Sequence, residues 1–271
     1  MGKWKNAPVV YVIVQVRFSP VLSLRTYIPQ IQEHFRRNGF PAFESRFNFQ
    51  LALTVPPPPA AAPQAEPEPA APAIPVERTV AYVFSNRDRS QSFMLEQNGL
   101  TLQVTDYLDF EWFLDLFLTH QDQVNEVIGP DSSERIGLRY IDAVLPKPDT
   151  KVKEYLIPAV LGLSEEPVEG TLQHSYSETV LLSGNTSTVS RIVVRNGQIG
   201  FPPDMGALPV VINPRFTEYR GSHALVDTDS FQMVHRPMEL QSLRSTLQHL
   251  HDSVEKVFNA VTTDFARADW K

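Results

Sequence analysis

The sequence predicts an α+β fold with two similar lobes, each a mainly antiparallel sheet with helices packed on one face. Three observations indicate it. Alternating apolar segments are typical of half-buried strands, and polar turns such as Asn98-Gly99 join several of them into hairpins. The remaining apolar segments have helical spacing, and the chain of 271 residues is long enough for a substantial core.

The first predicted lobe, residues 1–146, begins with a strand at Pro8–Phe18 that is rich in Val and Ile. A helix is expected after Ser19-Pro20, and strand character returns between Phe40 and Val55. Residues 56–75 are rich in Pro and Ala, and we interpret them as an exposed insertion between two strands of the lobe. A domain linker is the alternative, but the 55 residues before it hold too little core to fold alone.

The rest of this lobe is predicted as a meander of three strands, a helix and a final strand. The expected ranges are Thr79–Phe84, Ser92–Glu96 and Leu100–Thr105, a helix from Asp109 to Gly129, and Arg135–Leu145.

The second predicted lobe, residues 147–271, begins with a short helical or irregular segment at Lys151–Leu161. Strands are expected at Thr171–Leu182, Ser187–Ile199, Pro209–Asn213 and Phe216–Asp227, and Asp227 and Asp229 are interpreted as a turn. A long helix with a continuous apolar stripe is predicted at Glu239–Phe265, where it would pack across its own sheet or form a coiled coil with a partner.

Composition restricts the possible functions. The formal net charge of −7 disfavours nucleic acid as the partner, because phosphate binding needs a surplus of Lys and Arg. There are no cysteines, so disulfides and thiolate metal sites are excluded, and a reducing cytoplasm is the expected compartment. No apolar run is long enough to span a bilayer.

No catalytic or metal-binding motif is present, and no cofactor is expected. The seven histidines lack the helical spacings that place two metal ligands on one face, and His251 is interpreted as a buried histidine with satisfied hydrogen bonds. Phosphate-binding glycine loops and the nucleophile motif Gly-x-Ser-x-Gly are also absent.

The candidate binding residues are Arg17, Arg135, Arg139 and Asp142. Arg135 and Arg139 share one face of a strand, and Gly137 between them is expected to leave space for a carboxylate, phosphate or peptide backbone. The simpler alternative is that these arginines pair internally with carboxylates such as Asp142, Glu178 or Glu218, or lie on a solvated face of the sheet. The binding hypothesis predicts that replacing Arg135 or Arg139 with Ala weakens partner binding without unfolding the protein.

Three motifs resemble a sporadically distributed bacterial family with no assigned activity. They are the strand Pro8-Val9-Val10 ending at Val16-Arg17-Phe18, the strand Arg135–Asp142, and the closing Asp227-Thr228-Asp229 with His251, Phe258 and Thr262-Thr263-Asp264. The resemblance covers the whole chain, although that family usually has Asn at the position of Asp142 and a shorter Pro-rich segment. It transfers no catalytic residues, and its scattered distribution is similar to that of defence and toxin–antitoxin genes.

We therefore expect a non-enzymatic module that binds a protein, as an antitoxin, immunity or phage-defence component, with a homodimer as a further option. The alternatives are an RNA- or DNA-binding protein with ferredoxin-like repeats, and an enzyme whose dispersed residues form no readable motif.

Overall fold

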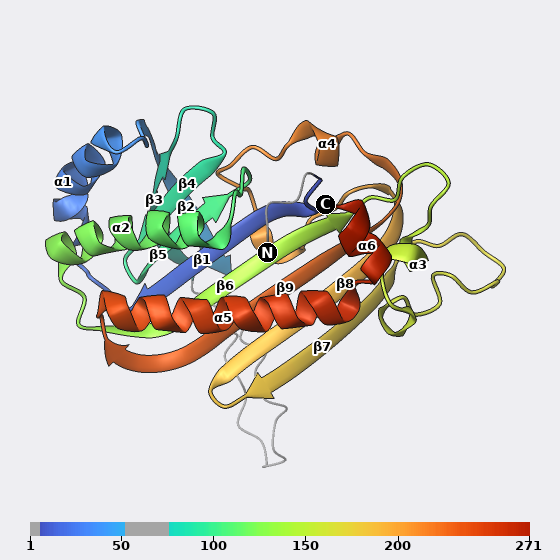
Figure 1. The fold of residues 1–271 in the computed structure, drawn as a ribbon. Coiled ribbons are helices and arrows are strands. Elements are labelled where there is room, and N and C mark those ends of the chain that lie inside the picture. Colours follow the sequence, from blue (N-terminus) through green and yellow to red (C-terminus); the bar gives the residue numbers. More distant parts are fainter. Residues whose placement is uncertain (1–5, 52–75) are drawn as a thin grey trace, which may run out of the picture.

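The fold is built on one nine-stranded antiparallel sheet, in the order β2-β3-β4-β5-β1-β6-β9-β8-β7 (Figure 1). The computed structural model describes residues 6–51 and 76–271. In chain order the strands are β1 (Val9–Phe18), β2 (Ala42–Leu51), β3 (Val76–Ser85), β4 (Gln91–Glu96), β5 (Gly99–Val104), β6 (Ser132–Val144), β7 (Ser175–Ser183), β8 (Thr186–Gln198) and β9 (Arg220–Pro237).

β1 and β6 lie in the middle of the sheet, as their apolar sequences require. β1 pairs with β5 on one side and with β6 on the other, and β6 pairs along its length with β9. Strands that are paired on both sides have no backbone edge exposed to water, so Val and Ile are favourable there.

Three long helices cover one face of the sheet: α1 (Leu24–Arg37), α2 (Phe110–Ile128) and α5 (Leu240–Val261) (Figure 1). Asp109 caps α2 by accepting a hydrogen bond from the amide of Trp112, and Gly129 ends it in the left-handed conformation. The apolar faces of all three helices share one core with β1, β5 and β6. The short helices α3 (Val152–Tyr155) and α6 (Asp264–Asp269) pack beside the end of α5 in a second cluster.

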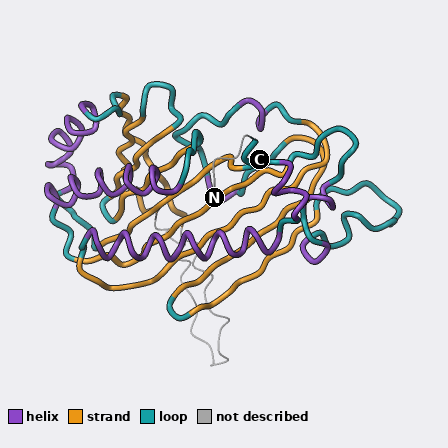
Figure 2. The backbone as a smooth tube through the Cα atoms, in the orientation of Figure 1, coloured by secondary structure: helices purple, strands orange, loops and turns teal. Residues whose placement is uncertain are grey.

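The opposite face of the sheet is covered only in part, by the segment from residue 199 to 219. This segment contains the helix α4 (Pro214–Thr217), and most of it is loop (Figure 2). Its apolar side chains, among them Ile199, Val210 and Phe216, pack on Tyr11 and Leu225. We call this whole face the open face, because no helix longer than α4 lies over it among residues 6–51 and 76–271.

The α+β class and the antiparallel sheet are confirmed. The predicted division into two lobes is not confirmed, because β6 and β9 join the strands of both predicted lobes into one continuous sheet. The proposed Pro-rich insertion at residues 56–75 lies outside the described residues.

Several predicted boundaries are wrong. β9 continues through Asp227 and Asp229 instead of turning there, and residues 209–213 form a loop instead of a strand. The long helix ends at Val261, because Thr262 is extended and bridges to Leu156 while Thr263 caps α6. Phe216, predicted in a strand, lies in α4.

In the described part of the chain, no helix combines the length and apolar character needed to cross a membrane.

Candidate binding face of the sheet

Charged side chains concentrate on the open face of the sheet. Because side chains alternate between the two faces of a strand, the helix-covered face takes the apolar residues and the open face takes their neighbours. The charged residues on the open face include Arg17 of β1, Arg135 and Arg139 of β6, Glu178 of β7, Arg191 and Arg195 of β8, and Asp227 and Asp229 of β9.

Arg139 is the centre of this charge cluster. Its Nε and Nη2 donate to the two carboxylate oxygens of Asp227, each at 2.7 Å, and its Nη1 donates to Asp204 at 2.6 Å. Burial alone would lower the pKa of Arg139, but the hydrogen bonds to Asp227 and Asp204 outweigh burial and raise it. The side chain of Asp227 is 3% exposed, so Arg139 neutralises a carboxylate that water scarcely reaches.

Arg135 occupies the space that Gly137 provides. It contacts Asp229 at 3.4 Å and Gln15 at 3.2 Å, and its guanidinium lies 4.7 Å from the centre of the Phe231 ring. A Cβ at Gly137 would lie 2.6 Å from Nη1 of Arg135. The guanidinium of Arg135 thus takes the space directly over Gly137, while a hollow beside Arg135 and Arg139 stays open, and ligand binding there stays a prediction.

The four predicted binding residues do not form one group. Arg17 is exposed near the end of β1, where it is the register partner of Arg135. Asp142 is buried on the helix-covered face, two residues from Tyr140 and Val144, whose side chains belong to the cores beneath the helices. Arg135 and Arg139 pair internally with carboxylates, as the simpler alternative predicts, but the partners are Asp229, Asp227 and Asp204, and Glu178 pairs with Arg191.

Asp142 belongs to a buried polar group beneath α2 and α5. Within the described residues neither of its carboxylate oxygens has a hydrogen-bond partner, and burial raises its pKa to about 8. Nearby, Tyr107 and Tyr140 hydrogen-bond to each other at 2.9 Å. His251 stacks on Phe110 with ring centres 3.9 Å apart, but neither ring nitrogen has a described partner, so the prediction of a satisfied histidine is wrong.

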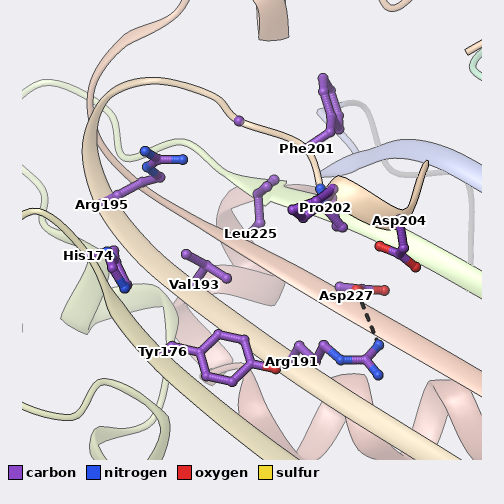
Figure 3. A pocket seen from close by; sticks show the side chains of 12 residues that line it. His174, Tyr176, Arg191, Val193, Arg195, Phe201, Pro202, Asp204, Leu225 and Asp227 are labelled. Atoms are coloured by element: carbon purple, nitrogen blue, oxygen red, sulfur yellow. Dashed lines mark ion pairs between the residues drawn. The ribbon is translucent and has the colours of Figure 1, made fainter. Parts of the chain in front are cut away.

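Two hollows lie on the open face on either side of Asp204. The larger, about 610 Å³, is lined by β7, β8, β9 and the start of the covering segment; we call it the Arg195 pocket (Figure 3). It is lined by His174, Tyr176, Arg191, Val193, Arg195, Gly200, Phe201, Pro202, Pro203, Asp204, Leu225 and Asp227. The smaller, about 270 Å³, is lined by Ile13, Gln15, Arg135, Gly137, Arg139, Asp204 and Asp229.

Sequence reasoning did not identify the Arg195 pocket. Its lining comes from three strands and a loop spread over residues 174–227, and no local motif joins them. The one available signal was Arg195 itself, which follows the apolar run Ile192-Val193-Val194 as Arg17 follows the apolar run of β1.

No group of three or more His, Asp or Glu side chains in the described ranges 6–51 and 76–271 is arranged to hold a metal ion. The sequence matches no protein-family model and no curated protein.

Proposed function

We propose that this protein is a non-catalytic module that binds an extended segment of another protein along the edge strand β7. β7 pairs with β8 on one side and, among the described strands, with none on its other side. Its free edge thus offers backbone donors and acceptors to an added strand.

The exposed apolar side chains of β7 carry this proposal. Leu182 is 78% exposed, and Val180 and Leu181 beside it are about half exposed. Edge strands that must stay unpaired are usually protected by Lys, Pro or a bulge. β7 contains no Lys, Arg or Pro, and its single charged residue, Glu178, is engaged by Arg191 at 2.7 Å.

The neighbouring open face extends the same surface. Val180 and Leu182 lie on that face, in register rows with Asp229 and Phe231 respectively. A segment added to β7 would therefore place its alternate side chains beside the Arg195 pocket. The charges at the centre of the face are largely paired with each other, so they do not carry the proposed binding, which rests on the edge of β7.

The narrower proposal is that the partner belongs to a toxin–antitoxin, immunity or phage-defence system. Its support is the resemblance of the chain to a bacterial family with a scattered distribution.

The test is affinity purification from the native host with wild-type bait and with Val180→Lys/Leu182→Lys bait, followed by direct binding with the purified partner. Lysines at these exposed positions leave the core intact, but they place charge on the proposed interface. We expect the double variant to lower partner affinity at least tenfold. Leu22→Lys, at an equally exposed site near α1, is the matched control.

Equal affinity of wild-type and Val180→Lys/Leu182→Lys proteins for the purified partner would contradict this proposal. If light scattering shows that the wild-type protein is a dimer and the double variant a monomer, the strand added to β7 comes from a second copy of the chain instead.

The topology favours nucleic acid as the second candidate. α2 joins β5 to β6 with β1 paired between them, which is the split β-α-β unit of ferredoxin-like RNA-binding domains. α1 departs from that pattern, because it joins β1 to β2 across three intervening strands. However, such domains stack bases on exposed aromatic rings, whereas Phe231 on the open face lies under Arg135. Binding of labelled RNA or DNA that weakens steeply with salt would support this candidate over a protein partner.

A further inference from the structure

We propose that the Arg195 pocket binds a small organic anion with an aromatic or apolar body. Its volume of about 610 Å³ lies within the range of pockets that hold small molecules in proteins. This ligand is separate from the protein segment proposed to bind β7, and either can bind without the other.

Arg195 is the group that requires a ligand. It lines the pocket, yet in the described part of the chain its side chain makes no hydrogen bond and no ion pair, and its Nε is buried without a partner. Arg135, Arg139 and Arg191 on the same face all contact carboxylates. A buried unpaired donor is costly, and a bound carboxylate or phosphate would satisfy it.

The surroundings of Arg195 leave its charge uncompensated. Its register partner on β9, His223, is buried, and burial lowers the pKa of that imidazole and favours its neutral form, which does not balance the charge of Arg195. The pocket carboxylates, Asp204 and Asp227, lie at the other end, where Arg191 contacts Asp227 (Figure 3). Both carboxylates also bind Arg139. Hence one end of the pocket attracts an anion.

The walls between the two ends suit an apolar or aromatic body. Val193 and Leu225 lie between the two ends, and the rings of Tyr176 and Phe201 lie on opposite sides of the pocket (Figure 3). Flat faces of this kind bind planar groups through stacking and dispersion. The pocket thus combines apolar walls with one cationic end. The ligand that fits it has an apolar or aromatic body and one anionic group.

Gly200 provides a probe of the position of Arg195. A Cβ at Gly200 would lie 2.5 Å from Nη1 of Arg195, so Gly200→Ala forces the guanidinium to move. In this variant the positive charge of Arg195 is kept, and only the position of the guanidinium changes. Arg195→Gln removes the charge, so the two variants separate charge from position.

The experiment uses three probes with the same ring system: naphthoate, naphthyl phosphate and the neutral naphthalenemethanol. Binding of each is measured by calorimetry, and methyl NMR of Val193 and Leu225 localises it. We expect the wild-type protein to bind at least one anionic probe more tightly than the neutral one. The preference between the first two probes identifies carboxylate or phosphate as the anionic group.

Arg195→Gln and Gly200→Ala are each expected to weaken the anionic probe about tenfold to hundredfold, as loss of a charged hydrogen bond predicts, with little change for the neutral probe. Arg220→Gln, at an exposed arginine outside the pocket, should bind like the wild type. Circular dichroism establishes that each variant is folded.

Failure of both anionic probes to bind the wild-type protein at millimolar concentration would overturn the inference. So would unchanged affinity in folded Arg195→Gln. Neither result affects the proposed binding at β7, which is measured with Val180 and Leu182 changed and Arg195 intact.

Discussion

Arg139 holds together carboxylates from two distant parts of the chain. Asp227 comes from β9 and Asp204 from the covering segment, and both bind the same guanidinium. Asp227 is almost fully buried, whereas Asp204 is 62% exposed and can be hydrated. Loss of Arg139 would thus leave one carboxylate buried with its main partner gone.

We predict that Arg139→Ala lowers the free energy of unfolding by about 3 kcal/mol, because the buried Asp227 then keeps only its longer contact with Arg191, at 3.6 Å. Urea unfolding of the wild type and the variant at pH 7 measures this difference in free energy. Arg139→Ala/Asp227→Ala should recover part of the loss. An unchanged urea midpoint in Arg139→Ala would contradict a structural role, and would return this residue to the binding hypothesis.

Asp142 makes stability depend on pH in the opposite way to most carboxylates. Burial raises its pKa to about 8, well above the value of about 4 expected in the unfolded chain. The folded state therefore keeps the proton through a pH range in which the unfolded state releases it. Its contribution to stability is fully present below pH 4 and is lost as pH rises toward 8.

Asp142→Asn should remove this dependence, because an amide of the same shape stays neutral. We expect the variant to be more stable than the wild type at pH 7, by on the order of 3 kcal/mol, and to lose that advantage at pH 4. Denaturant unfolding at the two pH values measures the difference. An equal effect at both pH values would show that Asp142 is not the group that titrates.

At the scale of elements, the sequence patterns predict most strands and helices. They do not predict that β9 continues through Asp227 and Asp229. Asp227 and Asp229 suggest a turn because carboxylates are rare inside paired strands. In the folded protein Arg139 and Arg135 of the neighbouring strand neutralise them. These arginines lie about ninety residues earlier in the chain, so a local pattern cannot show the pairing.

The end of α5 shows the same limit. The apolar spacing continues from Val261 to Phe265, and this predicts one uninterrupted helix. Thr262 instead bridges to Leu156, and Thr263 caps α6. The contact with Leu156 comes from a segment more than a hundred residues earlier, and it decides where the helix stops.

The candidate residues were predictable in part. The arginines of β6 stood out because charge interrupts an apolar strand, whereas the acids that bind them, and the pocket around Arg195, depend on how the sheet is assembled. Residue type could therefore identify which side chains are unusual, and only the fold could identify which of them has no partner.

At the scale of the whole molecule, the continuity of the nine-stranded sheet predicts that the protein unfolds in a single transition. β6 and β9 pair over almost the full length of β6, so neither predicted lobe can lose its strands without exposing an edge of the other. Trp112 lies in α2, and Trp270 packs against Phe258 near the other end of the fold. Variants that keep either tryptophan alone give a reporter for each half.

We expect the fluorescence of the two single-tryptophan variants to change at the same urea concentration, with Phe at the replaced positions. Circular dichroism of each variant provides the control, since it follows the whole sheet. Two separated midpoints in the same variant, one by fluorescence and one by circular dichroism, would support independent lobes.

The central place of β1 also determines when the chain can fold during synthesis. β1 is made first, but its two neighbours, β5 and β6, end only at Val104 and Val144, and the outer neighbour of β6 comes after residue 219. The most apolar strand must therefore leave the ribosome long before either of its edges is covered. Late pairings of this kind are slow and expose surfaces that aggregate. The edges of β1 consequently stay uncovered in the nascent chain until β5 and β6 have been synthesised.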